Sequence, residues 1–402
     1  MGNIVNVKSE IAPLKKVLLH RPGNELTNLV PDYLSEMLFD DIPWLAVAQR
    51  EHDAFAQTFR NLGIEVVYLT DLVCESIKSD GIKQLLVNDF LAEAIVHSPS
   101  QTEYIREYLL SLPTRKMVET MIAGMRKNEL NGRRTEHLVD YLNNQYPFLL
   151  DPMPNIYFQR DPFSIIGNGV AVSKMYTKQR SRETLFAKYI FSFHPDFCDT
   201  PKYYDRTLPY NIEGGDILIL NERTLAVGIS QRTHANGIEK LAENLLNEES
   251  GFKQIVAIDI PKQRSFMHLD TVFTMIDYDT FSIHPNTQKS FATLILTKEG
   301  KRIKIEQRDG KIEDTLKSVL ELDSVKLLKC GGDSSIDAAR EQWNDGANTL
   351  AVAPGEVIVY GRNNVTNKLF EDNGIIIHEI PCSELSRGRG GPRCMSMPIV
   401  RR

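Results

Sequence analysis

The spacing of apolar residues predicts a helix followed by a strand at five places along the chain. In each unit, apolar residues first recur every three or four positions and then form a short continuous run, which is typical of a buried strand. The predicted helices cover residues 51–61, 182–191, 237–246, 312–320 and 367–372, and four of the strands that follow cover 63–69, 254–258, 325–328 and 374–380. The strand of the second unit is the weakest of the five.

Acidic residues at regular intervals mark the joints between these units. Asp161, Asp216 and Asp270 each stand before an apolar run, and Asp333 follows a glycine pair. A period of roughly 50 residues predicts repeats of one α/β supersecondary unit, which bury their strands against each other in a stack or a ring. A closed ring would also remove exposed sheet edges, as in a propeller.

One segment, residues 72–149, interrupts this period with helical spacing. Predicted helices cover 81–97, 101–111, 115–127 and 134–144. We interpret the segment as an α-helical insertion into the first unit of a single domain spanning 1–402. A separate helical bundle is the alternative.

Composition excludes several classes of protein. The 402 residues are 42% hydrophobic and 25% charged, which is ordinary for a soluble globular protein. A net charge of −6 provides no global attraction to nucleic acid or to a membrane. The N-terminus lacks a signal-peptide pattern, no apolar run could span a membrane, and the five cysteines include no CxxC pair. We therefore expect a cytoplasmic protein.

The segment 390–395 is the first candidate for chemistry. A glycine pair and a proline predict a turn that presents Cys394 beside two arginines. We expect Arg389 and Arg393 to favour the reactive thiolate of Cys394. The alternative is an ordinary cysteine in a basic surface loop.

Other rare combinations fall at corresponding points of successive repeats. In a ring, Asp161, Glu213, His268, Asp270 and Cys394 would converge on one pocket. A thiol with an imidazole suits nucleophilic catalysis with proton transfer, and Glu213 could accept a hydrogen bond from that imidazole. Two carboxylates, Asp161 and Asp270, suit a planar guanidinium.

Each of these residues also has a structural alternative. His268 could be a buried structural histidine, Gly214 and Gly215 a simple turn, and Arg160 with Asp161 an ion pair. A metal site is also conceivable, because its four ligands would be residue types that bind iron or manganese: His268, Asp161, Asp270 and Glu213. Metal chemistry would leave Cys394 without a role.

Segments 155–162, 213–216, 268–271 and 390–398 resemble the signature segments of the bacterial arginine deiminase family, in the same order and over essentially the full length. The resemblance implies a five-unit α/β propeller with pseudo-fivefold symmetry, known as a pentein. It also implies hydrolysis of L-arginine to L-citrulline and ammonia without a metal or an organic cofactor. Gln159 departs from the family pattern, in which threonine is common.

The resemblance also implies a role for each candidate residue. Cys394 is expected to be the nucleophile, His268 the general acid and base, and Glu213 its orienting partner. Asp161 and Asp270 would hold the guanidinium. The expected contacts to the rest of the substrate are Arg180, Arg232 and Arg389 for the carboxylate, Asn155 and Phe158 for the amino group and aliphatic stem, and Leu38 in a pocket cover.

Functions of other classes stay open at this stage. An amidinotransferase shares the covalent chemistry, and a hydrolase of agmatine or methylated arginine is conceivable, although agmatine offers no carboxylate to the three arginines. A non-enzymatic arginine sensor or surface adhesin is a third class, and a nucleic-acid binder is the least favoured. The expected partners are L-arginine and further copies of the chain, in a dimer or tetramer.

Overall fold

The computed structural model describes residues 4–94, 99–129, 137–138, 141, 146–262, 266–285 and 291–402. The predicted helix over 134–144 lies largely outside these residues. Within the described ranges, no helix has the length and apolar character needed to cross a membrane.

Five of the sheets in the described part of the chain share one strand pattern. Each has a middle strand with one antiparallel and one parallel neighbour. In the order antiparallel, middle, parallel they are β19 (Met397–Arg401), β1 (Leu14–Leu19) and β2 (Glu65–Tyr68); β5 (Phe163–Ile166), β6 (Gly169–Val172) and β7 (Lys202–Tyr204); β8 (Ile217–Asn221), β9 (Thr224–Ile229) and β10 (Gln254–Asp259); β11 (Phe273–Met275), β12 (Thr280–Ile283) and β15 (Lys326–Lys329); β16 (Leu350–Ala353), β17 (Glu356–Tyr360) and β18 (Ile376–Ile380). We call the antiparallel strands β19, β5, β8, β11 and β16 the entry strands.

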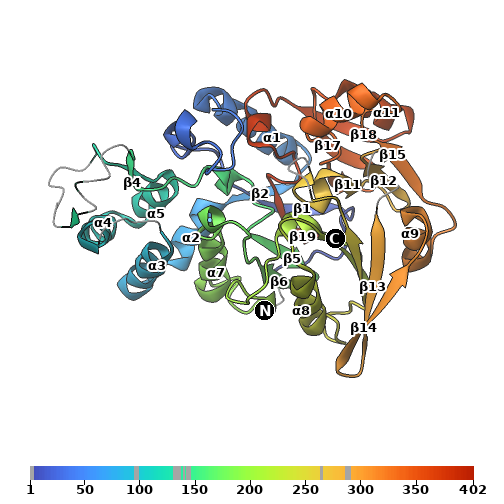
Figure 1. Cartoon of the computed structure of the whole chain (residues 1–402), viewed down its shortest axis with the longest axis horizontal. Helices are drawn as coiled ribbons and strands as arrows, with labels where there is room; N and C mark the ends of the chain where they lie inside the picture. Colours follow the sequence, from blue (N-terminus) through green and yellow to red (C-terminus); the bar gives the residue numbers. More distant parts are fainter. Residues whose placement is uncertain are drawn as a thin grey trace.

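A helix connects the middle strand of each sheet to its parallel neighbour, because parallel strands need a long crossover. These helices are α1 (Leu45–Asn61), α7 (Glu183–Phe193), α8 (Ala235–Leu245), α9 (Ile312–Leu320) and α11 (Asn364–Asp372). They agree with the five helices predicted from apolar spacing. In Figure 1, α8, α9 and α11 lie towards the outside of the molecule, whereas most residues of α7 are buried. The first sheet joins the two ends of the chain, since β1 pairs with β19.

The helical segment between the first and second sheets contains α2 (Leu69–Ser76), α3 (Asp80–Glu93), α4 (Pro99–Ser111) and α5 (Thr114–Ala123). It occupies one end of the molecule in Figure 1. The prediction that α5 extends to residue 127 is wrong. Gly124 ends the helix with φ of +77°, and β3 (Met125–Arg126) then pairs with β4 (Phe148–Leu150).

Elements that were not predicted include α10 (Ser335–Trp343), β13 (Ala292–Glu299) and β14 (Arg302–Arg308). Strands β13 and β14 form a hairpin that extends the third sheet beyond β10. The edge strand β14 alternates charged and apolar residues that are almost all exposed, so its pattern lacks the apolar run of a buried strand.

Asp333 is a wrongly predicted landmark of the repeat. Its side chain is 91% exposed and forms a surface ion pair with Lys329, whereas Asp161, Asp216 and Asp270 are buried just before entry strands. The residue that stands before the entry strand of the fifth sheet is instead Asn348, two positions ahead of Leu350.

Candidate active site

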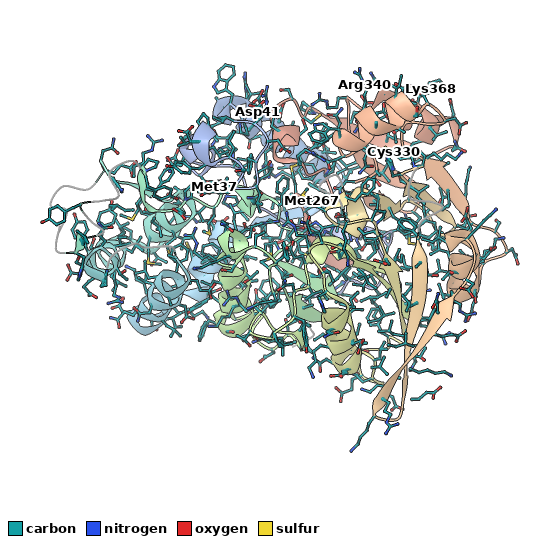
Figure 2. The ribbon with its side chains drawn as sticks, in the orientation of Figure 1. Met37, Asp41, Met267, Cys330, Arg340 and Lys368 are labelled. Carbon is teal, nitrogen blue, oxygen red and sulfur yellow. The ribbon has the colours of Figure 1, made fainter. Side chains whose placement is uncertain are left out.

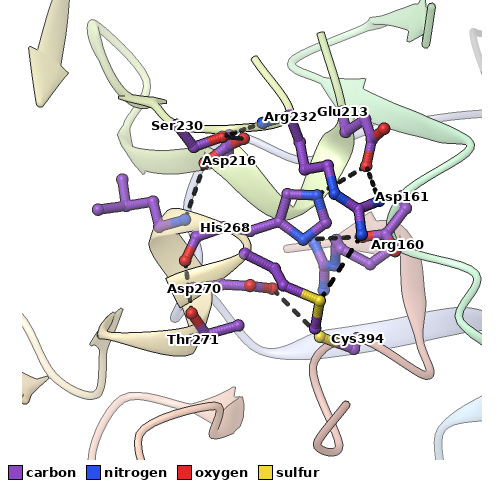
Figure 3. Close-up of polar contacts among 12 residues, drawn as sticks. Arg160, Asp161, Glu213, Asp216, Ser230, Arg232, His268, Asp270, Thr271 and Cys394 are labelled. Atoms are coloured by element: carbon purple, nitrogen blue, oxygen red, sulfur yellow. Dashed lines mark hydrogen bonds and ion pairs between the residues drawn. The ribbon is translucent and has the colours of Figure 1, made fainter. Parts of the chain in front are cut away.

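The five predicted catalytic side chains are buried together where the chain enters four of the sheets. Asp161 precedes β5, Glu213 precedes β8, His268 and Asp270 precede β11, and Cys394 precedes β19. None of them is more than 4% exposed. Figure 3 shows them facing one another, which confirms that they converge.

His268 lies between two carboxylates. Its Nε2 is 2.8 Å from Oε2 of Glu213, and its Nδ1 is 3.7 Å from Oδ1 of Asp161. The other oxygen of Glu213 accepts a hydrogen bond from the backbone N–H of Tyr176 at 2.8 Å. A side chain at Gly215 would come within 2.6 Å of Nδ1 of His268, so only glycine leaves room for this arrangement.

The charges around His268 favour its protonated form. Burial lowers the pKa of His268, but the charges of Asp161 and Asp216 and the hydrogen bond that His268 donates to Glu213 together raise it to about 9. For Glu213, burial raises the pKa, and the charges of Arg232 and His268 outweigh it and lower the pKa to about 2. At neutral pH the pair is therefore an imidazolium beside a carboxylate.

Cys394 has the opposite balance from the one we expected. Its Sγ lies 3.7 Å from Oδ2 of Asp270. Burial and the carboxylates of Asp270, Asp161 and Asp345 raise the pKa of the Cys394 thiol well above its ordinary value, and Arg393 only partly opposes them. Arg393 thus favours the thiolate as predicted, but burial and the carboxylates outweigh it, so the predicted reactive thiolate is not the favoured form in this state of the site.

Arg393 has a limited effect on the Cys394 thiol because its guanidinium binds two carboxylates. Its Nη1 donates to Oδ2 of Asp270 at 2.8 Å, and its Nε and Nη2 donate to Glu10 at 3.1 Å. All three side chains are buried. Arg393 thus neutralises Asp270 and ties the N-terminal segment to the cysteine loop.

Asp161 and Asp270 each bind an arginine of the chain itself. Nη1 of Arg180 donates to Oδ2 of Asp161 at 2.7 Å, as Arg393 does to Asp270, and Arg180 also contacts Glu183 at 2.8 Å. In the described part of the chain, Oδ1 of Asp161 and Oδ1 of Asp270 have no hydrogen-bond partner. The two carboxylates therefore retain acceptors for a further guanidinium.

The three arginines expected at the substrate carboxylate have separate partners in this structure. Arg180 pairs with Asp161, and Nη1 of Arg232 lies 3.6 Å from Oε2 of Glu213. Nη1 of Arg389 lies 3.5 Å from Oδ2 of Asp40. Among the described residues, Nη1 of Arg232 and both Nε and Nη1 of Arg389 have no hydrogen-bond acceptor, so these donors are available.

A second contact of Arg232 is with a methionine in the middle of the molecule. Nη2 of Arg232 is 3.7 Å from Sδ of Met267, which Figure 2 labels near the centre, whereas Arg340 and Lys368 lie at the periphery.

Arg389 adopts a left-handed backbone with φ of +63°, and its guanidinium stacks 3.6 Å from the ring centre of Trp343.

Asn155 and Phe158, the residues expected to contact the amino group and the aliphatic stem of the substrate, belong to one segment of the chain. Asn155 binds the segment that contains Leu38, and Phe158 contacts the cysteine loop. Nδ2 of Asn155 donates to the backbone C=O of Met37 at 2.7 Å, next to Leu38, whose φ is +63°. The Phe158 ring lies against Gly390, where any side chain would collide with it. The side chain of Leu38 is half-buried.

Sequence reasoning missed four buried partners of the site: Glu10, Glu183, Asp345 and Asn348. No motif marks Glu10, because it reaches the site only through the fold. Asn348 could have been found, since it precedes the apolar strand 350–353 as Asp161 precedes 163–166.

One group of side chains in the described ranges offers metal-ligand atoms. Atoms of Asp161, Glu213 and His268 lie within 4.8 Å of one another, while Asp270 and Cys394 are not part of this group. These atoms already bind one another or an arginine, so the set reads equally well as a hydrogen-bonded catalytic group.

Solved structures with this fold modify guanidino compounds. An amidinotransferase from Microseira wollei matches with a TM-score of 0.55 at 14% identity, over 99% of this chain and 98% of that one. The N-terminal domain of a cyanobacterial arginine dihydrolase matches with a TM-score of 0.53 at 13% identity, over 96% and 97%. The chain therefore shares the α/β fold of these two proteins.

Sequence comparison is more specific. The arginine deiminase family model matches residues 35–401. An arginine deiminase of Clostridium perfringens (strain SM101 / Type A) is 53% identical over 406 aligned positions, covering 99% of this chain and 98% of that protein. The chain belongs to the arginine deiminase family, and so to the hydrolases that act on a guanidino C–N bond.

Proposed function

We propose that this protein hydrolyses L-arginine to L-citrulline and ammonia through a covalent thiouronium intermediate on Cys394. The proposal depends on one observation: four kinds of group lie together in a buried site. They are the thiol of Cys394, the imidazolium of His268, the carboxylate of Glu213 that binds it, and two further carboxylates, Asp161 and Asp270, that have acceptor atoms without a partner among the described residues. Family membership supports the same reaction.

In the proposed first step, Asp161 and Asp270 hold the substrate guanidinium beside Cys394. The added cation offsets the carboxylate charges that hold the thiol protonated, so the thiol releases its proton to the surrounding water. The thiolate then forms the S–C bond to the guanidinium carbon. His268 gives its proton to the departing nitrogen, the C–N bond breaks, and ammonia leaves.

In the second step, His268 is neutral and accepts a proton from water. The resulting hydroxide attacks the thiouronium carbon and the S–C bond breaks. The proton of the added hydroxyl passes to the Cys394 sulfur, so citrulline leaves and the thiol is restored. Glu213 keeps the imidazole oriented in both steps and stabilises its protonated form. Atoms balance as arginine and water giving citrulline and ammonia, and no metal or organic cofactor takes part.

We assign the rest of the substrate to residues around this centre. The α-carboxylate is held by Arg180, Arg232 and Arg389, for which the unused donors of Arg232 and Arg389 are the support. Asn155 and Phe158 contact the amino group and aliphatic stem, and Leu38 belongs to the cover. Because each arginine now pairs with a carboxylate of the chain, substrate binding exchanges one anionic partner for another.

We also propose that the chain is one propeller domain of five blades about a pseudo-fivefold axis, interrupted by a helical insertion over 72–149. The repeated strand pattern of five sheets supports this. We further propose that the protein is a dimer or tetramer in the cytoplasm and has no nucleic-acid or membrane partner. The five free cysteines are consistent with a reducing compartment.

The test measures citrulline and ammonia from L-arginine with purified protein. The wild type and a Cys198→Ser control, altered at an exposed cysteine, should turn over equally, and Cys394→Ser should not. Acid quenching during turnover should add mass to the Cys394 peptide alone. Absence of citrulline from well-folded wild type, or turnover by Cys394→Ser, would refute the proposal.

A further inference from the structure

Asn348 occupies the place in the fifth sheet that catalytic residues occupy in the other sheets. It stands two residues before entry strand β16, as Asp161 stands two residues before β5. Asp270 and Cys394 each stand three residues before their entry strands. Asn348 is completely buried, although it carries a polar side chain. Buried polar groups are retained where they form specific hydrogen bonds.

The Asn348 amide joins two segments of the candidate active site. Its Oδ1 accepts a hydrogen bond from the backbone N–H of Cys394 at 3.0 Å, and its Nδ2 donates to the backbone C=O of Asp270 at 3.0 Å. One planar group therefore spans the nucleophile and the carboxylate that lies 3.7 Å from its sulfur. Because both contacts are to backbone atoms, Asn348 fixes the relative positions of the two loops that carry Cys394 and Asp270.

The segment that carries Asn348 is itself anchored to the strand that follows Asp270. Nε2 of Gln342 donates to the C=O of Thr271 at 2.6 Å, and Oγ1 of Thr274 donates to the C=O of Ala347 at 2.6 Å. These bonds hold the segment that leads into Asn348. The amide is thus presented from a support that belongs to the Asp270 side of the site.

The cysteine loop is shaped to receive this amide. A side chain at Gly391 would come within 2.7 Å of the C=O of Asn348 and 2.8 Å of its Oδ1. Only a residue without Cβ lets the loop backbone approach so closely. The glycine pair before Cys394 therefore has a physical reason in its contact with Asn348.

We propose that Asn348 is a positioning residue, which fixes the sulfur of Cys394 relative to the carboxylate of Asp270 by binding both backbones with one amide. Its effect on turnover rests on the proposed function, whereas its effect on the geometry around the thiol does not. Asparagine is suited to this place because it combines one acceptor and two donors without charge. Aspartate has the same shape but lacks the donor that Asp270 requires.

Two substitutions separate these contributions. Asn348→Ala removes both hydrogen bonds and should lower kcat for L-arginine about 100-fold, the cost of a displacement of about 1 Å, while KM changes less than about threefold. Asn348→Asp keeps the acceptor for the Cys394 N–H, loses the donor to Asp270, and adds a carboxylate. Asn344→Asp is the matched control, because the Asn344 side chain bonds only to the C=O of Arg340 near the surface.

Alkylation of Cys394 by iodoacetamide gives a readout that needs no turnover. The groups that act on this thiol are Asp270, Asp161, Asp345 and Arg393. The pH at which the Cys394 peptide is half-maximally alkylated, read by mass spectrometry, should move upward in Asn348→Asp and stay at the wild-type value in Asn344→Asp. The added carboxylate acts on the thiol only if residue 348 lies against the Cys394 loop, and a residue that only stabilised the fold from a distance would not shift this pH.

Circular dichroism and thermal unfolding show which variants are folded. If Asn348→Ala does not fold, the isosteric Asn348→Asp carries the test. Near-wild-type kcat in folded Asn348→Ala, or an alkylation curve of Asn348→Asp that coincides with the wild type, overturns the proposal. Should wild type produce no citrulline, the proposed function fails, and the alkylation comparison still decides the role of Asn348.

Discussion

Replacing Glu213 with glutamine removes one buried charge without changing the shape of the side chain. Glu213 is completely buried, and its Oε2 is 2.8 Å from Nε2 of His268. We expect Glu213→Gln to lower the pKa of His268, which lies at about 9 in the wild type. A hydrogen bond between charged groups contributes about 1.5 to 3 kcal/mol, so the pKa should fall to roughly 7 to 8.

The same interaction appears in the stability of the protein. The folded-state pKa of His268, about 9, lies above the ordinary value of 6.5. Protonated His268 therefore adds stability that is complete below pH 6.5 and is lost as the pH rises through 9. The difference between the two pKa values corresponds to about 3 kcal/mol. The lowered pKa of Glu213 describes the same pair and is not counted again.

Two measurements check this prediction. NMR titration of labelled histidines follows His268 directly, with its resonance assigned by its loss in His268→Asn. Urea unfolding between pH 6 and 9.5 should show that the wild type loses about 1.5 to 3 kcal/mol more than Glu213→Gln does. Other titrating groups are common to both proteins and cancel in this comparison. At neutral pH, kcat of Glu213→Gln should be about 100-fold lower, a typical general acid–base contribution.

A second histidine–glutamate pair provides the control. Glu75 lies 2.9 Å from Nε2 of His194, but the Glu75 side chain is 60% exposed. Glu75→Gln should leave both the His268 titration and kcat unchanged. A wild-type midpoint for His268 near 6.5, or the same midpoint in Glu213→Gln, would refute the electrostatic reasoning.

Three further predictions follow from the ion pairs and from the absence of a cofactor in the proposed reaction. Arg180→Ala leaves Asp161 and Glu183 buried without their cation, so urea unfolding should show a loss of about 3 to 5 kcal/mol; a loss below about 1 kcal/mol would contradict the buried pairing. Arg389→Ala should raise KM for L-arginine at least about tenfold and leave any slow turnover of agmatine unchanged, and an equal effect on both would show that Arg389 does not bind the carboxylate. Dialysis against EDTA should leave kcat unchanged, whereas a loss that added metal restores would overturn the cofactor-free reaction.

Helices and repeats were largely predictable because their signal is local. The helix over 312–320 was predicted with its bounds, since its apolar face repeats at the helical period. Strand β14 was not predicted because it is an exposed edge strand, which lacks the apolar run of a buried strand. Asp333 was taken for a landmark because a glycine pair precedes it, yet the strand that matters begins at Leu350.

The candidate catalytic residues were predictable by type and place, but their charge states were not. The titration of Cys394 depends on burial and on Asp345, which is distant in sequence and gave no motif. Arg393 lowers the pKa of the thiol as expected, but its hydrogen bonds go to Asp270 and Glu10, which the sequence did not reveal. Long-range ion pairs of this kind are decided by how the chain closes on itself.

Side-chain types and their spacing were enough to predict the period of the repeats, the five candidate catalytic residues and the family to which the chain belongs. These depend on side-chain type and spacing, which folding does not alter. Only the tertiary structure decided which carboxylate faces which cation, that His268 is held protonated while the Cys394 thiol is not ionised, and that Asn348 bridges two loops. Electrostatic energy and hydrogen bonding depend on distances of a few ångströms and on burial, and residues far apart in sequence acquire these only in the folded chain.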